Sequence, residues 1–187
     1  MDDSDVLELK RQGIHLLNGF FITAAVYVLK PIIGLWVLAP LVLALILLFT
    51  VPRFLPGNWI SDFLMRHFER RKDIEEFPFK GAIYYGLGII FPIALLEVRY
   101  CCAVILILSV GDCFSTLIGR RYGRTRIGKR SLEGAVGFLA TAWPAATVMV
   151  GPVNAFWLAF AGSLVELFDP FNDNITVPAA LTFILLI

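Results

Sequence analysis

The sequence predicts an all-α protein, a polytopic membrane helix bundle with about seven transmembrane or half-membrane helices. Three observations support this. Hydrophobic residues make up 58% of the 187 residues and charged residues 17%, whereas soluble domains are about 45–50% apolar and about 25% charged. The apolar residues form uninterrupted segments of membrane-spanning length. The charged residues collect between some of these segments and are nearly absent between others. The formal net charge of +1 gives no positive field for a nucleic-acid partner.

Seven apolar segments are expected to form helices, since a membrane span needs about 20 apolar residues. Residues 31–50 contain no charge, and residues 100–119 contain one, Asp112. Residues 13–29, 81–98 and 134–151 are near the lower length limit, and residues 153–168 are short and contain Glu166. Residues 176–187 would reach only about two-thirds of the way across at ~1.5 Å per residue, and they are expected to form either a half-span or a full span that thins the bilayer locally. The oligomeric state stays open, although a homodimer would cover this last segment better.

The cations predict the orientation of the bundle. Fourteen of the sixteen Lys and Arg residues fall in residues 1–12, 51–80 and 120–133, while Lys30 and Arg99 lie on the opposite side. By the positive-inside rule, the N-terminus and both basic loops are cytoplasmic, within a single multi-pass domain, 1–187. Residues 58–77 carry an apolar stripe at helical spacing, flanked by arginines, and are predicted as an interfacial amphipathic helix that begins at the N-cap Asn58. The alternative is a cytoplasmic extension that packs on another helix.

Four carboxylates are predicted to lie together near the cytoplasmic surface. Asp112 lies about two helical turns before Arg120, roughly 10 Å from that surface, and Glu166 is near the end of its segment. Carboxylates within spans are costly and usually serve a site. With Glu133 and Asp173 at the same level, the set is suited to holding Mg²⁺ for phosphoryl transfer, with basic residues neutralising phosphate. The alternative is that each acid pairs with a neighbouring arginine.

The residues around these acids resemble a known family. Residues 111–123 (GDCFSTLIGRRYG) and 130–134 (RSLEG) are similar to the motifs of the CTP-dependent lipid kinases, which include dolichol kinases, phytol kinases and CTP-dependent diacylglycerol kinases. Residues 173–178 (DNITVP) and 8–15 (ELKRQGIH) resemble further motifs of this family. Arg130 stands for the usual Lys, with Lys129 adjacent, and Gln12 stands where many members have Lys.

The resemblance implies a reaction and roles for the motif residues. The hydroxyl of a membrane lipid alcohol would attack the γ-phosphate of CTP on the cytoplasmic face, giving lipid monophosphate and CDP. The implied catalytic residues are Asp112, Glu133 and Asp173, and the implied Mg²⁺ ligands are Asp112, Glu133, Glu166 and Asp173. The implied nucleotide and phosphate ligands are Arg11, His15, Arg120, Arg121, Lys129, Arg130, Ser131 and Asn174. For the arginines, plain positive-inside topology is an equal alternative, and Ser131 could simply cap a helix that begins at Leu132.

Two other functions fit the same residues less well. A CTP:phosphatidate cytidylyltransferase would use the same nucleotide and metal ion but keep CMP on the lipid. A small ion-coupled transporter would use Asp112 and Glu166 as a relay, and it would need polar residues throughout the bilayer depth, whereas here they gather at one face.

Overall fold

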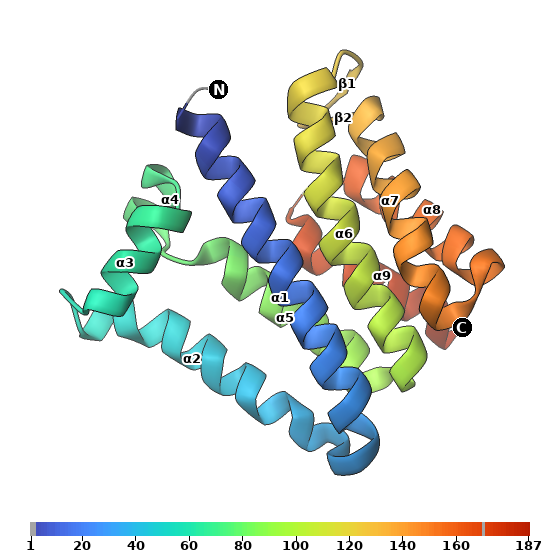
Figure 1. The fold of residues 1–187 in the computed structure, drawn as a ribbon, viewed down its shortest axis with the longest axis horizontal. Coiled ribbons are helices and arrows are strands. Elements are labelled where there is room, and N and C mark those ends of the chain that lie inside the picture. The colour runs from blue at the N-terminus through green and yellow to red at the C-terminus, as the bar shows by residue number, and fades with distance from the viewer. Residues whose placement is uncertain (1–2, 170) are drawn as a thin grey trace.

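The chain folds almost entirely into helices. The computed structural model describes residues 3–169 and 171–187 (Figure 1). The elements in order are α1 Asp3–Ile33, the 3₁₀-helix η1 Gly34–Val37, α2 Leu38–Phe54, α3 Trp59–Phe68, α4 Arg71–Glu76, α5 Lys80–Leu95, α6 Val98–Tyr122, β1 Arg126–Ile127, β2 Arg130–Ser131, α7 Leu132–Val150, α8 Pro152–Leu167 and α9 Asp173–Leu186. The predicted all-α class is confirmed, with one short antiparallel hairpin, β1–β2, between α6 and α7.

Three helical stretches of the described residues are long and apolar enough to cross a membrane: Asp5–Phe54, Val98–Tyr122 and Leu132–Val150. Shorter apolar helices cover Lys80–Leu95, Pro152–Leu167 and Asp173–Leu186. One predicted boundary is wrong. The expected segment 31–50 is not continuous, because α1 runs on to Ile33 and the chain then turns through η1. Gly34 has a φ of +60° there, a conformation that glycine adopts without steric cost.

Helix α6 forms the centre of the bundle. It packs against α1, α5, α7, α8 and α9, and its residues from Cys101 to Cys113 are all buried. Small residues allow this close packing: a Cβ added at Gly111 would lie 2.5 Å from the Phe138 ring of α7. Because α6 is covered on all sides, polar side chains that it directs into the bundle must find partners there.

Helix α9, the predicted half-span, is covered within the chain. It packs against α5 and α8, and Val177 and Leu181 are fully buried. A Cβ added at Gly88 of α5 would lie 1.9 Å from the backbone oxygen of Asn174, so the two helices cross in very close contact. The face of α9 toward α5 therefore needs no partner subunit to cover it.

Helix α2 and the two short helices after it lie apart from the centre of the bundle. In α2 no residue is buried, and the helix diverges from the bundle toward α3 and α4 (Figure 1). The predicted amphipathic helix 58–77 is divided into α3 and α4, with Glu69 and Arg70 in extended conformation between them. Asn58 caps α3 as predicted, since its side chain accepts hydrogen bonds from the backbone N–H groups of Ile60 and Ser61.

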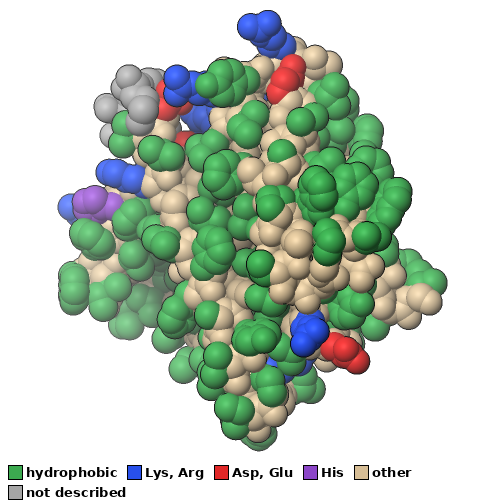
Figure 2. All heavy atoms as spheres, turned by 45° about the vertical axis from the view of Figure 1, so that its right-hand side comes forward, with side chains coloured by type: hydrophobic (Ala, Val, Ile, Leu, Met, Phe, Trp, Pro, Cys, Tyr) green, Lys and Arg blue, Asp and Glu red, His purple; other side chains and the backbone are tan. Residues whose placement is uncertain are grey.

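Charged side chains collect at one end of the bundle. We call this the hairpin end, because the β1–β2 hairpin and the start of α1 both lie there (Figure 1). In Figure 2 the visible face is largely hydrophobic, with charged side chains at its upper edge and a small charged group lower down.

Candidate active site

Three of the four predicted carboxylates meet inside the bundle. Asp112 comes from α6, Glu166 from α8, and Asp173 is the first residue of α9. They are 7%, 0% and 7% exposed, and one oxygen atom from each lies within 4.8 Å of the others. We call these three residues the carboxylate cluster. Helices that are far apart in sequence supply them, so only the packing of α6, α8 and α9 brings them together.

The Arg130 side chain, which comes from β2, reaches into this cluster. Its Nη1 lies 3.1 Å from Glu166 Oε1, its Nη2 lies 3.5 Å from Asp112 Oδ1, and Nη2 also contacts Asp173 Oδ2. One guanidinium thus contacts all three carboxylates. Thr116 of α6 joins the group, since its Oγ1 accepts a hydrogen bond from Arg130 Nη1 at 3.3 Å and donates one to Asp112 Oδ1 at 3.4 Å.

The cluster holds more negative charge than Arg130 can neutralise. When ionised, three carboxylates and one guanidinium leave an excess of two negative charges in buried surroundings, where unpaired charge is expensive. Ser115 donates a hydrogen bond of 2.6 Å to Glu166 Oε1, but Glu166 Oε2 and Asn174 Oδ1 are buried and have no hydrogen-bond partner among the described residues. Such oxygen atoms are the ligands that Mg²⁺ prefers. The residues present therefore fit a divalent cation held by Asp112, Glu166 and Asp173.

Helix α1 brings His15 to the edge of the cluster. His15 Nε2 lies 3.7 Å from Asp112 Oδ2, and the imidazole packs edge-on against the Tyr85 ring at a centroid distance of 4.7 Å. One turn further along, α1 crosses α6 at Gly19, where an added Cβ would lie 2.1 Å from Ser109 Oγ. This close crossing sets the distance between His15 and Asp112.

The remaining residues predicted from the basic loop lie outside the cluster. Glu133 is separate from the other three acids: both of its carboxylate oxygens accept a hydrogen bond from the Thr125 backbone N–H, at 3.0 and 3.2 Å. Glu133 and Arg121 instead line an open pocket of about 400 Å³ at the hairpin end. Ser131 caps α7, accepting a 3.1 Å hydrogen bond from Gly134 N–H, and Lys129 is exposed at the hairpin turn.

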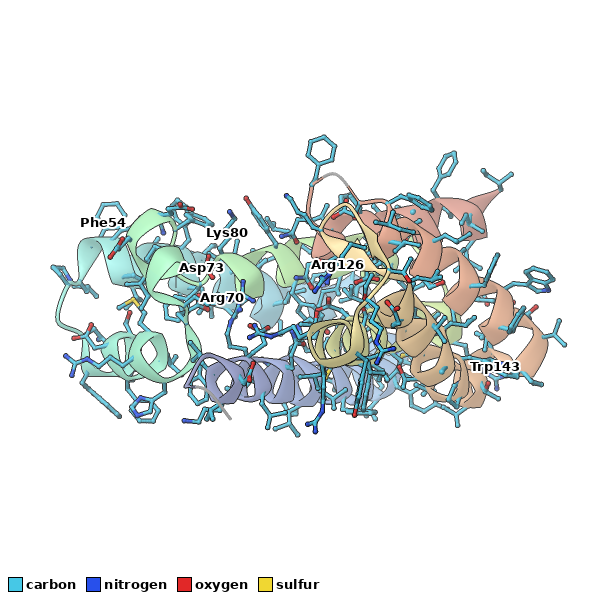
Figure 3. All side chains as sticks on the ribbon, turned by 90° about the horizontal axis from the view of Figure 1, so that it is seen from above. Phe54, Arg70, Asp73, Lys80, Arg126 and Trp143 are labelled. Atoms are coloured by element: carbon cyan, nitrogen blue, oxygen red, sulfur yellow. The ribbon has the colours of Figure 1, made fainter. Side chains whose placement is uncertain are left out.

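Two predicted phosphate ligands belong to a second cluster. Glu8 of α1 is 2% exposed, and its Oε2 lies 2.6 Å from Arg70 Nη2, 3.3 Å from Arg120 Nη1 and 3.4 Å from Arg11 Nη1. We call Glu8, Arg11, Arg70 and Arg120 the Glu8 cluster. It joins α1, α6 and the link between α3 and α4, and the Arg70 side chain extends from that link toward α1 (Figure 3).

Glu8 is not among the predicted site residues, although the sequence carries a signal for it. Glu8, Arg11, Gln12 and His15 follow the spacing i, i+3, i+4, i+7, which places all four on one face of a helix. Gln12 donates a 3.1 Å hydrogen bond to Glu8 Oε1. One face of α1 therefore carries both the Glu8 cluster and, two turns further on, the histidine beside Asp112.

Near this cluster, Glu69 is a buried acid between α3 and α4. It is 9% exposed, and its Oε2 has no hydrogen-bond partner among the side chains that the structure describes. Burial raises its pKa above the ordinary value of 4.5, and the repulsion of Asp73 adds to the effect, while Arg11 and Arg70 oppose it. The ionised form of Glu69 is therefore disfavoured in the folded protein.

Comparison with known proteins identifies a relative without assigning a function. The chain is 28% identical over 185 residues to the uncharacterized protein MJ1137 of Methanocaldococcus jannaschii, and the match covers 95% of this chain and 92% of that protein. No protein-family model and no solved structure matches the chain. The similarity to the archaeal protein extends over nearly the full length of both chains.

Proposed function

We propose that this protein is a CTP-dependent lipid kinase, which transfers the γ-phosphate of CTP to the hydroxyl of a membrane lipid alcohol. The observation that carries the proposal is the buried carboxylate cluster with Arg130 inserted from a basic hairpin. Carboxylates that hold Mg²⁺ and an arginine that neutralises phosphate oxygens are the parts that phosphoryl transfer requires. The motif resemblance supplies the nucleotide and the class of acceptor, a polyprenol, a shorter isoprenoid alcohol or diacylglycerol.

In the proposed reaction, Asp112 accepts the proton of the lipid hydroxyl. The lipid hydroxyl oxygen bonds to the γ-phosphorus of CTP, the bond from that phosphorus to the bridging oxygen breaks, and CDP leaves with the electron pair. The hydroxyl proton passes to Asp112 Oδ2, the oxygen that faces His15 rather than Arg130. Mg²⁺, held by Asp112, Glu166 and Asp173, would supply charge neutralisation at the phosphates. Glu133 orders the hairpin that carries Arg130.

The proposal includes a multi-pass membrane topology with the hairpin end in the cytoplasm. The three membrane-length stretches and three shorter apolar helices support it, as does the concentration of cations at that end. Helix α3 would then lie on the membrane surface. Trp59, Ile60 and Phe63 on this helix are 76%, 51% and 50% exposed, which is expected for the lipid-facing side of an interfacial helix.

Incubation of the purified protein with lipid alcohols, Mg²⁺ and CTP labelled at the γ-phosphate tests the reaction. Label recovered in the lipid, and lost in an Asp112→Asn variant that still folds, is the expected result. Label in pyrophosphate together with a CDP-lipid would identify a cytidylyltransferase instead. If no lipid of a panel of polyprenols, short isoprenoid alcohols and diacylglycerols is labelled with CTP or ATP, the kinase proposal is overturned.

A further inference from the structure

We propose that the Arg130 guanidinium and a divalent cation compete for the same three carboxylates, so that cation binding releases Arg130 from the cluster. The proposal rests on the proposed function only for the destination of the released side chain, the nucleotide phosphates. The competition itself follows from the contacts of Arg130.

The first step is that both cations need the same space. Arg130 nitrogens contact one oxygen of each carboxylate, namely Asp112 Oδ1, Glu166 Oε1 and Asp173 Oδ2. Those three residues offer oxygens that lie within 4.8 Å of one another. Mg²⁺ binds its ligands at about 2.0–2.1 Å, which places the oxygens around one ion roughly 3–4 Å apart. A metal ion held by these carboxylates would lie within a few ångströms of the guanidinium, and the repulsion between two cations at that separation opposes their binding together.

The second step is that the acids and the arginine sit on different kinds of element. The three carboxylates are buried, on helices packed around α6. Arg130 is on the two-residue strand β2, in a hairpin whose turn contains Gly128 with a φ of +59°, and its side chain is 27% exposed. The arginine can therefore move outward with little disturbance of the core, while the carboxylates stay in place.

The third step is the charge balance. Without a metal ion, Arg130 partly compensates the buried acids, which would otherwise repel one another. A divalent cation neutralises more of their negative charge, so the guanidinium is no longer needed to offset it. The released side chain carries its positive charge toward the surface of the hairpin end, where Lys129 and Arg126 are already exposed. A phosphate-bearing ligand would meet this cation only after the metal ion had bound.

Binding of Mn²⁺ alone, without nucleotide or lipid, tests the competition. Free Mn²⁺ is measured by electron paramagnetic resonance during titration of the full chain in detergent micelles. If Arg130 occupies the site about nine-tenths of the time, the wild type binds Mn²⁺ about tenfold more weakly than a protein with a free site. We therefore expect Arg130→Gln to bind Mn²⁺ about tenfold more tightly than the wild type. Lys129→Gln removes an adjacent, exposed cation and is the matched control, with an expected change of less than about twofold, since exposed charges are screened.

Two further variants keep the test decisive. Arg130→Lys retains the charge but lacks the forked geometry needed to contact three carboxylates, so we expect Mn²⁺ affinity between those of the wild type and Arg130→Gln. Glu166→Gln should lose most Mn²⁺ binding, which locates the ion. Unchanged or weaker Mn²⁺ binding by folded Arg130→Gln and Arg130→Lys would overturn the proposal. This result is independent of kinase activity, because no substrate is present, and failure of the lipid assay would leave it standing.

Discussion

The carboxylate cluster and the Glu8 cluster both lie toward the hairpin end, yet they combine acid and base in opposite proportions. In the carboxylate cluster three buried acids share Arg130, and Glu166 Oε2 is left without a hydrogen-bond partner in the part of the chain that the structure describes. In the Glu8 cluster one buried acid is surrounded by three arginines. The first arrangement has a deficit of positive charge that a metal ion can fill. The second is balanced within the chain, because Arg11 also lies 3.9 Å from Asp73 and Arg120 lies 3.0 Å from Asp5, and it holds three segments together.

This difference separates the charged residues that are proposed to act in the site from those that hold the helices together. Arg11 and Arg120 seemed equivalent to Arg130 as phosphate ligands, because all three belong to the set of cations that the sequence predicts to be cytoplasmic. Their partners separate them, since Glu8 engages the first two and the carboxylate cluster engages Arg130. The expected outcomes below test this division, from the largest effect to the smallest.

Removing a charge from the carboxylate cluster should have the largest effect. In the proposed reaction Asp112 accepts the hydroxyl proton and Asp173 helps to hold Mg²⁺, so we expect Asp112→Asn and Asp173→Asn each to lower the lipid phosphorylation rate at least ~100-fold. The rate is measured by transfer of γ-label from CTP. Glu75→Gln, which changes an exposed acid of α4, is the control and should retain full activity. Activity near the wild-type level in Asp173→Asn would remove this residue from the catalytic site.

Breaking the Glu8 cluster should instead reduce stability. Glu8→Ala leaves Arg11, Arg70 and Arg120 without their shared acid. Because these side chains keep 19%, 50% and 39% exposure, solvent limits the cost to about 2–3 kcal/mol. Thermal unfolding in micelles measures this effect, and Mn²⁺ affinity should stay within about twofold, as expected for a well-separated site. Wild-type stability with weakened Mn²⁺ binding would reverse the roles assigned to the two clusters.

The connection between the clusters through α1 can be tested at the crossing with α6. Gly19→Ala places a Cβ 2.1 Å from Ser109 Oγ, which forces the helices apart and should cost about 1–2 kcal/mol. It should also lower activity by moving His15 away from Asp112. Gly13→Ala on the same helix meets no atom within 4 Å and should stabilise by about 0.5–1 kcal/mol.

The double variant Gly19→Ala with Ser109→Gly provides a further check on that crossing. Ser109→Gly removes the two atoms closest to the new Cβ and leaves Tyr85 Oη at 3.3 Å, so activity should recover relative to Gly19→Ala alone. If activity is not restored, the loss does not come from this contact.

The smallest expected effect concerns Glu69, whose pKa is raised by burial. An acid whose pKa is higher in the folded than in the unfolded protein stabilises the fold at pH values below its unfolded pKa, near 4.5. That stabilisation is lost as the pH rises through the folded pKa. Glu69→Gln should therefore melt at a higher temperature than the wild type at pH 7, with the difference shrinking toward pH 4. A difference that grows as the pH falls would contradict the assigned direction.

The sequence predicted local features of the fold well. The apolar segments correspond to helices, and the cap at Asn58 forms as predicted, because a cap depends on residues within one turn of it. Ser131 caps α7, which was the alternative to its predicted role as a phosphate ligand. Two local predictions were wrong or incomplete for reasons that lie elsewhere in the chain. The segment 31–50 is interrupted at η1, and the helix 58–77 is divided where Arg70 turns toward Glu8. The Arg70–Glu8 contact joins residues 62 positions apart, so no local pattern indicates it.

By itself, the sequence determined the helical class, the apolar segments and the acids and bases from which a site could be built. Only the tertiary structure decided that Asp112, Glu166 and Asp173 converge while Glu133 stays with Thr125, and that Arg130, rather than Arg11 or Arg120, enters the cluster. The physical reason is that the period of a helix fixes which face a residue occupies, whereas contacts between helices depend on their crossings. Here those crossings are set by close approaches such as Gly19 on Ser109 and Gly88 on Asn174.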